Sequence, residues 1–188
     1  MKQSGCNRTI VAPESGSQWV VDNLMHKKLN LIKVKKVIRW CKKYNLSVDA
    51  FFLIGMPGEK KSQIEETIKY AKELRKIGVD DCGFGVLVPH RGTEAYQIAV
   101  KNNWLRNIET DNFVKGLSTG EPMIETPYLS AEDIKTMFKK AIKVNQVIPY
   151  AKLRLAFFIL FHSPRRFVKL SISYLLKQIG ISDGLLGT

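Results

Sequence analysis

The stretch that decides the fold is Val48–Ile54 (VDAFFLI), together with the turn that follows it, Gly55–Glu59 (GMPGE). A short apolar run that ends in a turn rich in Gly and Pro is typical of a buried strand. The same arrangement occurs on both sides of this stretch. Arg8–Ala12 (RTIVA) precedes the turn PESGS, and Phe84–Val88 (FGVLV) precedes the turn PHRGT. The sequence therefore predicts three buried strands.

Apolar residues recur at helical spacing after each turn, so strands and helices alternate. Ser62 and Glu65 form a capping-box pattern, Gly78 is placed as a C-terminal cap, and Thr93 is placed as an N-terminal cap. The alternation predicts an α/β fold with a parallel sheet and right-handed crossovers. Residues expected to face the core from these helices are Val20, Val21, Leu24, Leu31, Val34, Ile38, Cys41, Ile64, Ile68, Ala71, Leu74, Tyr96, Ala99 and Val100.

All three turns lie at the carboxyl ends of predicted strands, where parallel sheets bind ligands. At the first turn, the Glu14 carboxylate can accept bonds from ribose hydroxyls or an ammonium group. The alternative is a loop in which Ser15 or Ser17 caps the next helix. At the second turn, two glycines around a proline expose backbone against which an adenine can lie. The alternative is a plain strand-to-helix turn with Glu59 near the helix start.

At the third turn, His90 and Arg91 can reach a carboxylate or a phosphate. An exposed loop histidine is the alternative, and we favour it. The other two histidines have no spacing that suggests a metal site or a catalytic triad.

The rest of the chain divides into two parts. Residues 106–129 are expected to form an irregular connection, since this segment is rich in Gly and Pro. Residues 130–188 are expected to form a helical basic extension, in which Ser130 caps a helix with Ile134, Met137, Phe138, Ala141 and Ile142 on one face.

The net charge is +13, and the C-terminal part carries most of it, with ten Lys or Arg and one acid from Lys135 onward. The apolar stripes of 153–179 beside Arg and Lys are compatible with peripheral contact to an anionic membrane, or simply with packed helices. Nucleic acid is not expected, because the basic residues form no recognisable binding module.

No run is long enough to span a bilayer. Three widely spaced cysteines favour the cytoplasm. The C-terminal stripes leave peripheral contact at the inner face of the membrane open.

The ordered set of motifs resembles the radical SAM superfamily. The set is ESGS, then about forty residues to FFLIGMPGE, then about thirty to PxxGTExY, and it lies within residues 1–105. The chain looks most like the C-terminal half of members that carry a cobalamin-binding domain. This resemblance implies a partial, half TIM-like parallel barrel of about three strand–helix units. It also implies that the intact enzyme uses S-adenosylmethionine and a 4Fe-4S cluster.

The resemblance assigns cofactor-binding roles by position. Glu14 with Ser15 matches the contact to the ribose or amino end of S-adenosylmethionine. Gly55, Pro57, Gly58 and Glu59 match the turn beside its adenine and methionine portions, and Val88 and Pro89 match a contact near the adenine. No catalytic residue and no metal ligand is assigned.

The family's Cys-x3-Cys-x2-Cys loop is not reproduced by Cys6, Cys41 and Cys82. The first three strand–helix units are missing as well, and cobalamin would need a separate N-terminal domain. We therefore expect a chain that is inactive alone and needs a missing N-terminal half or a partner chain. The alternative is a non-catalytic half-barrel that docks on a partner chain or a membrane surface. The sequence does not name a substrate.

Overall fold

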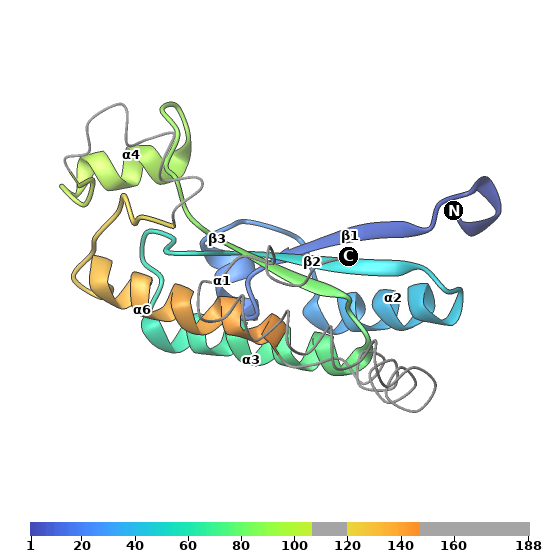
Figure 1. The fold of residues 1–188 in the computed structure, drawn as a ribbon. Coiled ribbons are helices and arrows are strands. Elements are labelled where there is room, and N and C mark those ends of the chain that lie inside the picture. The colour runs from blue at the N-terminus through green and yellow to red at the C-terminus, as the bar shows by residue number, and fades with distance from the viewer. Residues whose placement is uncertain (107–119, 147–188) are drawn as a thin grey trace, which may run out of the picture. The chain divides into compact units, whose positions relative to one another are not determined.

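Three parallel strands in the order β1-β2-β3 form an open sheet, which confirms the predicted α/β class. The structure is a computed structural model that describes residues 1–106 and 120–146. The helices α2, α3 and α6 lie along one face of the sheet (Figure 1). The elements are η1 (Lys2–Ser4), β1 (Arg8–Glu14), α1 (Gln18–Asn23), α2 (Leu31–Lys43), β2 (Ser47–Ile54), α3 (Lys61–Ile77), β3 (Asp81–Val86), α4 (Glu94–Lys101), α6 (Ala131–Ile142) and η2 (Lys143–Gln146).

The central strand β2 carries the core. Alternate residues point to opposite faces of a strand, so one set of its side chains faces the helices. This set is fully or almost fully buried, and Phe52 in it stacks on Phe84 of β3 at a ring separation of 5.1 Å. The opposite set includes Phe51, which is 48% exposed. The buried set is Val48, Ala50, Phe52 and Ile54.

The third strand lies earlier in the chain than predicted. It spans Asp81–Val86, not 84–88, because Asp81 pairs with Asp49 and the register continues from there. Gly83 and Gly85 weaken the strand signal in the sequence. Gly83 is needed where it stands, since a Cβ there would lie 2.5 Å from the Phe51 ring.

The start of α3 also differs from the prediction. The backbone N–H of Lys60 donates to the Gln63 side chain at 2.8 Å, and the helix begins at Lys61. The capping-box pattern of Ser62 and Glu65 was therefore wrong, because a glutamine two residues before Glu65 does the capping. Gly78 does end the helix, with φ 117.

The other predicted caps are confirmed. Thr93 accepts from the N–H of Tyr96 at 3.3 Å, and Ser130 accepts from the N–H of Asp133 at 3.1 Å. Most of the predicted core residues are buried or partly buried. Two were wrong: Val100 and Ile142 are 47% and 45% exposed. Both lie near the C-terminal end of their helix.

The two edges of the sheet differ. At the outer edge of β3, the side-chain amide of Asn145 accepts from the N–H of Cys82 at 2.9 Å and donates to its carbonyl at 2.7 Å. At this one residue, an amide side chain thus makes the two bonds that a neighbouring strand would make. Along β1, every second residue from Arg8 to Ala12 is exposed. Among the described residues, Asn145 thus covers the β3 edge at Cys82, whereas no strand pairs with the outer edge of β1.

Helix α6 packs against α3 and β3. The chain divides into two compact units, Met1–Gln146 and Val147–Thr188. The helices predicted within 153–179 lie outside the described residues. Within the described part, no helix is long and apolar enough to cross a membrane.

Replacing Asn145 with Ala should lower the free energy of unfolding by about 2 kcal/mol, because it leaves the N–H and carbonyl of Cys82 without partners. Chemical denaturation of the full chain measures this. Asn23→Ala is the control, since the Asn23 amide makes an exposed bond to the Trp19 carbonyl. Equal effects of the two substitutions would show that the Asn145 amide does not stabilise the edge of β3.

Candidate functional site

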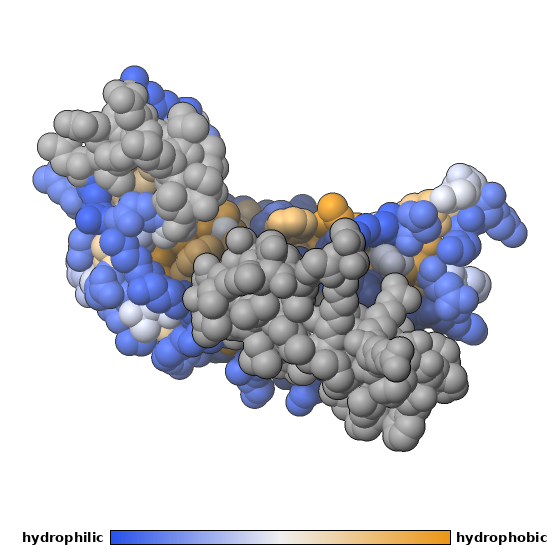
Figure 2. Space-filling model, in the orientation of Figure 1, coloured by the Kyte–Doolittle hydropathy of each residue, from blue (hydrophilic) through white to orange (hydrophobic). Residues whose placement is uncertain are grey.

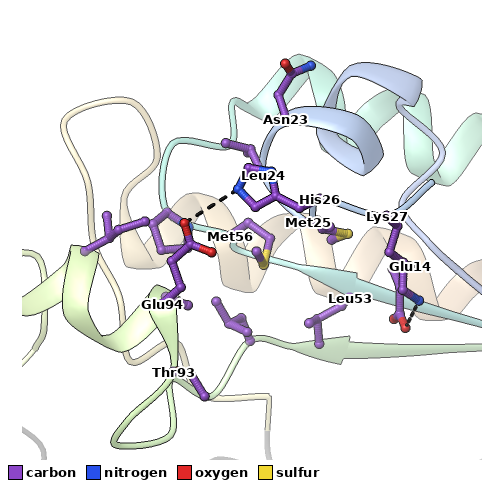
Figure 3. Close-up of a pocket in the computed structure, with 14 residues that line it drawn as sticks. Glu14, Asn23, Leu24, Met25, His26, Lys27, Leu53, Met56, Thr93 and Glu94 are labelled. Carbon is purple, nitrogen blue, oxygen red and sulfur yellow. Dashed lines mark hydrogen bonds and ion pairs between the residues drawn. The ribbon is translucent and has the colours of Figure 1, made fainter. Parts of the chain in front are cut away.

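A cavity of about 490 Å³ lies at the carboxyl ends of the strands, as the positions of the turns predicted (Figure 3). Its walls come from the end of β1, the loop after α1, the turn after β2 and the first turn of α4. Small-molecule sites usually have volumes of this size, and they combine apolar walls with a few polar groups. The lining residues are Glu14, Asn23, Leu24, Met25, His26, Lys27, Leu53, Met56, Pro57, Leu87, Thr93, Glu94, Ala95 and Ile98.

The main polar feature of the cavity is an ion pair between Glu14 and Lys27. The Lys27 Nζ atom lies 2.8 Å from Glu14 Oε1, and the two side chains are 40% and 28% exposed, respectively. The same amine donates to the Ala12 carbonyl at 3.3 Å. Glu14 has φ 65, and the register of β1 shifts between Val11 and Glu14. Such irregularities re-aim side chains at strand ends.

The sequence did not single out Lys27, but the lengths of the helices place it. Helix α1 has only six residues and rises about 9 Å, so the chain that leaves it is still near the carboxyl edge. The 13-residue helix α2 then carries the chain back toward the start of β2. The loop that includes Lys27 must therefore lie beside the carboxyl edge.

The rim of the cavity carries a second contact between polar side chains. His26 Nε2 lies 3.5 Å from Glu94 Oε1, and both side chains are mostly exposed. Sequence spacing gave His26 no partner, because Glu94 is far away in the chain and comes from α4.

The turn after β2 is held by a buried carboxylate. Glu59 Oε2 accepts from the N–H of Gly55 at 2.7 Å and from that of Met56 at 3.1 Å. The side chain is fully buried, and its Oε1 atom has no hydrogen-bond partner. Burial raises the pKa of Glu59 to about 7, although the two backbone bonds favour the charged form. Gly55 and Gly58 have φ 86 and φ 88, which suits glycine in a tight turn.

The first turn packs on α3 rather than opening into the cavity. The hydroxyl of Ser15 is buried 2.9 Å from the Thr67 hydroxyl, which also accepts from the N–H of Gly16 at 2.9 Å. A Cβ on Gly16 would lie 2.5 Å from Cβ of Tyr70 and 2.6 Å from Cα of Thr67. Ser17 occupies the N-cap position of α1 but makes no side-chain capping bond.

The structure brings only part of the predicted set of cofactor-binding residues to the cavity. Glu14 and Pro57 line it, and Gly55, Gly58 and Glu59 belong to the turn that carries Pro57. Ser15 faces α3. The remaining residues are not part of the lining: Val88 and Pro89 are buried after the end of β3, and His90 and Arg91 are exposed.

The three cysteines do not converge. Cys6 precedes β1, Cys41 lies on α2, and Cys82 is buried in β3. Among residues 1–106 and 120–146, no group of three His, Cys, Asp or Glu side chains is placed to hold a metal ion. The described part of the chain therefore does not fit an iron–sulfur cluster, which usually needs several thiolate ligands.

Fold and site together define an open α/β sheet with a small-molecule cavity at its carboxyl edge. No protein-family profile matches the sequence. The chain is 27% identical to an uncharacterized methyltransferase of Pyrococcus horikoshii over 141 residues, which are 75% of this chain and 29% of that protein. It is 29% identical to cytidylyl-2-hydroxyethylphosphonate methyltransferase of Streptomyces wedmorensis, over 56% of this chain and 20% of that enzyme.

A third relative is biotin synthase of Methanocaldococcus jannaschii, with 38% identity over 43% of this chain and 21% of that enzyme. The chain is thus distantly homologous to part of radical SAM methyltransferases and related enzymes. It spans less than a third of the length of each of these relatives.

The free energy of unfolding should fall as the pH rises from about 5 to 8. The contribution of Glu59 alone to this fall should be up to about 3 kcal/mol. The raised pKa means that folded Glu59 keeps a proton which the unfolded chain releases. Glu59→Gln should remove this part of the pH dependence, because the amide oxygen still accepts both backbone bonds. Denaturation at several pH values measures it. Glu65→Gln, at an exposed position of α3, is the control and should retain the wild-type slope.

Gly16→Ala should destabilise the chain by about 1–3 kcal/mol, because the new methyl group would meet the backbone of α3. Thermal unfolding reports the loss. Gly85→Ala is the matched control, since a Cβ there meets only a Leu53 methyl at an ordinary 3.5 Å. A Gly16→Ala chain as stable as the Gly85→Ala chain would mean that the turn does not pack tightly on α3.

Proposed function

We propose that this chain supplies the S-adenosylmethionine-contacting part of a radical SAM enzyme whose cluster-binding part is a separate polypeptide segment. The observation that carries this proposal is the Glu14–Lys27 ion pair inside the cavity at the carboxyl edge. Distant homology to part of radical SAM enzymes supports it. When bound, the cofactor would supply the methionine and adenosyl groups that such enzymes use.

The cavity suits the two ends of S-adenosylmethionine. An α-amino acid is zwitterionic, so its ammonium group can pair with the Glu14 carboxylate and its carboxylate with the Lys27 amine. Leu53, Met56 and Pro57 offer apolar surface to an adenine. In the unliganded chain, Glu14 and Lys27 neutralise each other, so a zwitterion can replace both partners without leaving a charge unpaired.

We assign supporting roles in this site to most of the remaining predicted residues. Gly55, Gly58 and Glu59 shape the turn that presents Pro57, so they position the wall rather than bind directly. Ser15 holds the first turn against α3. The assignment of Val88 and Pro89 to the adenine remains part of this proposal, and it requires the segment after β3 to approach the ligand.

No cluster chemistry is assigned to this chain, because its cysteines do not fit the group. We expect no turnover from the chain alone. Cobalamin would have to be held by a further domain. The second candidate is a non-catalytic half-barrel that binds a partner chain, and it is favoured by the outer edge of β1, with which no strand of the described part pairs. Membrane contact through 153–179 is the other form of this candidate.

Lys27→Met and Glu14→Gln should each weaken S-adenosylmethionine binding by about tenfold, since each removes one charge-assisted contact. Isothermal titration calorimetry of the full chain measures the affinity. Lys28→Met is the control, because Lys28 is the next residue, is exposed and does not line the cavity. Equal affinities of the Lys27 and Lys28 variants would contradict the proposed site, and undetectable binding by the native chain would favour the non-catalytic candidate.

A further inference from the structure

The outer face of helix α2 carries charge of one sign. The helix has six basic residues and no acidic one, whereas α1, α3, α4 and α6 each contain at least one acidic residue. Lys35 pairs with Glu73 of α3 at 2.6 Å. Lys42 pairs with Asp80, which follows α3, at 2.9 Å, so these two lysines are used within the fold. The other four basic residues are exposed: Lys33, Lys36, Arg39 and Lys43.

Two large apolar side chains lie among these basic groups. Ile32 and Trp40 are 68% and 62% exposed. Lys36 lies midway between them in the sequence, and Lys43 follows Trp40 after three residues. Residues three or four apart are neighbours on a helix, so the four form one stripe about 17 Å long. We call this stripe, Ile32, Lys36, Trp40 and Lys43, the α2 outer stripe.

The α2 outer stripe faces away from the core. With 3.6 residues per turn, it lies on the side of the helix opposite the three residues that α2 buries. Those residues are Leu31, Val34 and Ile38. The stripe therefore projects outward from the helix layer, where a flat partner can reach all four of its side chains at once.

The sheet has an exposed apolar surface of a different kind. Figure 2 shows apolar residues along the side of the sheet that the helices leave uncovered. There, however, Arg8 pairs with Asp49 at 2.7 Å, so basic and acidic groups occur together. The α2 outer stripe combines exposed apolar groups with basic groups alone, and this combination restricts the charge of its partner.

Other parts of this chain are poor partners for the α2 outer stripe. A second copy that packed through the stripe would bring two basic helices together. Residues 147–188 carry six Lys or Arg and one acid. Like-charge contacts across an interface are unfavourable, so charge complementarity points to an anionic partner.

The apolar members of the stripe distinguish between anionic partners. A tryptophan ring suits the headgroup level of a bilayer, and an isoleucine can enter the boundary with the acyl chains. Long basic side chains beside them can still reach the anionic headgroups. A nucleic acid offers phosphates to the lysines, but binding to its bases relies on stacking, which Ile32 cannot provide. The stripe therefore fits a lipid surface better than a nucleic acid.

We propose that the α2 outer stripe binds the surface of an anionic lipid bilayer. Ile32 and Trp40 enter the headgroup layer, while Lys36 and Lys43 contact lipid phosphates. The two basic residues that flank the stripe add to the attraction. This contact uses a helix of the described part, so it is separate from any contact through 153–179. None of its residues lines the cavity, so it does not depend on S-adenosylmethionine.

Co-sedimentation of the full chain with lipid vesicles tests the charge requirement. Vesicles of equal parts phosphatidylglycerol and phosphatidylcholine should bind the native chain, whereas pure phosphatidylcholine should not. Lys36→Glu with Lys43→Glu should lower the partition coefficient at least about twentyfold, because each basic residue near an anionic surface contributes about fivefold. Binding should also fall about tenfold between about 0.05 and 0.3 M NaCl, because salt screens exposed charges.

A matched control separates the stripe from net charge. Lys139→Glu with Lys140→Glu changes the net charge equally, on two exposed residues of α6. This form should bind within about threefold of the native chain, because charges away from the contact are screened. If the charge-reversed α2 form fails to fold, Lys36→Gln with Lys43→Gln replaces it, and the α6 control then takes the same two glutamines.

Tryptophan fluorescence with vesicles whose acyl chains are brominated locates the apolar contact. Brominated chains quench a tryptophan that enters the bilayer, so the native chain should lose part of its emission. Trp40→Phe should still bind but should show no quenching, although Trp19, which is 52% exposed, remains. Ile32→Ser should weaken binding about tenfold, because it removes apolar surface from the contact. Ile142→Ser is the control on α6, where this residue is 45% exposed, and should leave binding unchanged.

The outcomes decide the proposal without S-adenosylmethionine in the assay. No binding of the native chain to phosphatidylglycerol vesicles would overturn it, and so would an equal loss from the α2 and α6 charge variants. Quenching that persists in the Trp40→Phe chain would place another part of the chain in the bilayer and would also overturn it. Binding to a single-stranded oligonucleotide that Lys36→Glu with Lys43→Glu abolishes, without vesicle binding, would assign the stripe to nucleic acid instead.

Discussion

The parallel pairing of β2 with a strand on each side is the constraint on which the rest of the structure depends. It brings the ends of β1 and β2 and the start of the segment after β3 to one edge of the sheet. It also fixes which side chains of β2 meet the helices and which remain open. The cavity lies where the turns meet, and its charged groups come from segments that only this pairing brings together.

The sequence predicted this arrangement well where the signals are local. The run VDAFFLI, the turn glycines and the threonine and serine caps each specify their own conformation. The limits of β3 could not be predicted from its own residues, because Gly83 and Gly85 are poor strand formers. They lie in a strand because they pair with β2. The exposure of Val100 and Ile142 depends on what lies opposite the last turn of a helix, which periodicity does not describe.

The site was likewise predictable where its residues belong to local sequence patterns. Glu14 and Pro57 were found because one ends β1 and the other lies in the turn after β2. Lys27 was missed because its role comes from the shortness of α1, a geometric property rather than a motif. Ser15 was grouped with Glu14 because the ESGS motif matches both to one family position, yet successive residues at the end of a strand point in different directions. The hydroxyl therefore meets α3 while the carboxylate meets the cavity.

The asymmetry between the sheet edges has a consequence for how copies of the chain can accumulate. Growth of a fibril by strand addition requires two usable edges on each molecule, so that every added copy offers a new end. Because Asn145 occupies the far edge at Cys82, the start of β3 offers a second copy neither the N–H nor the carbonyl of that residue. Strand addition at this end of β3 would first have to displace the amide, so growth through β3 is hindered at its start.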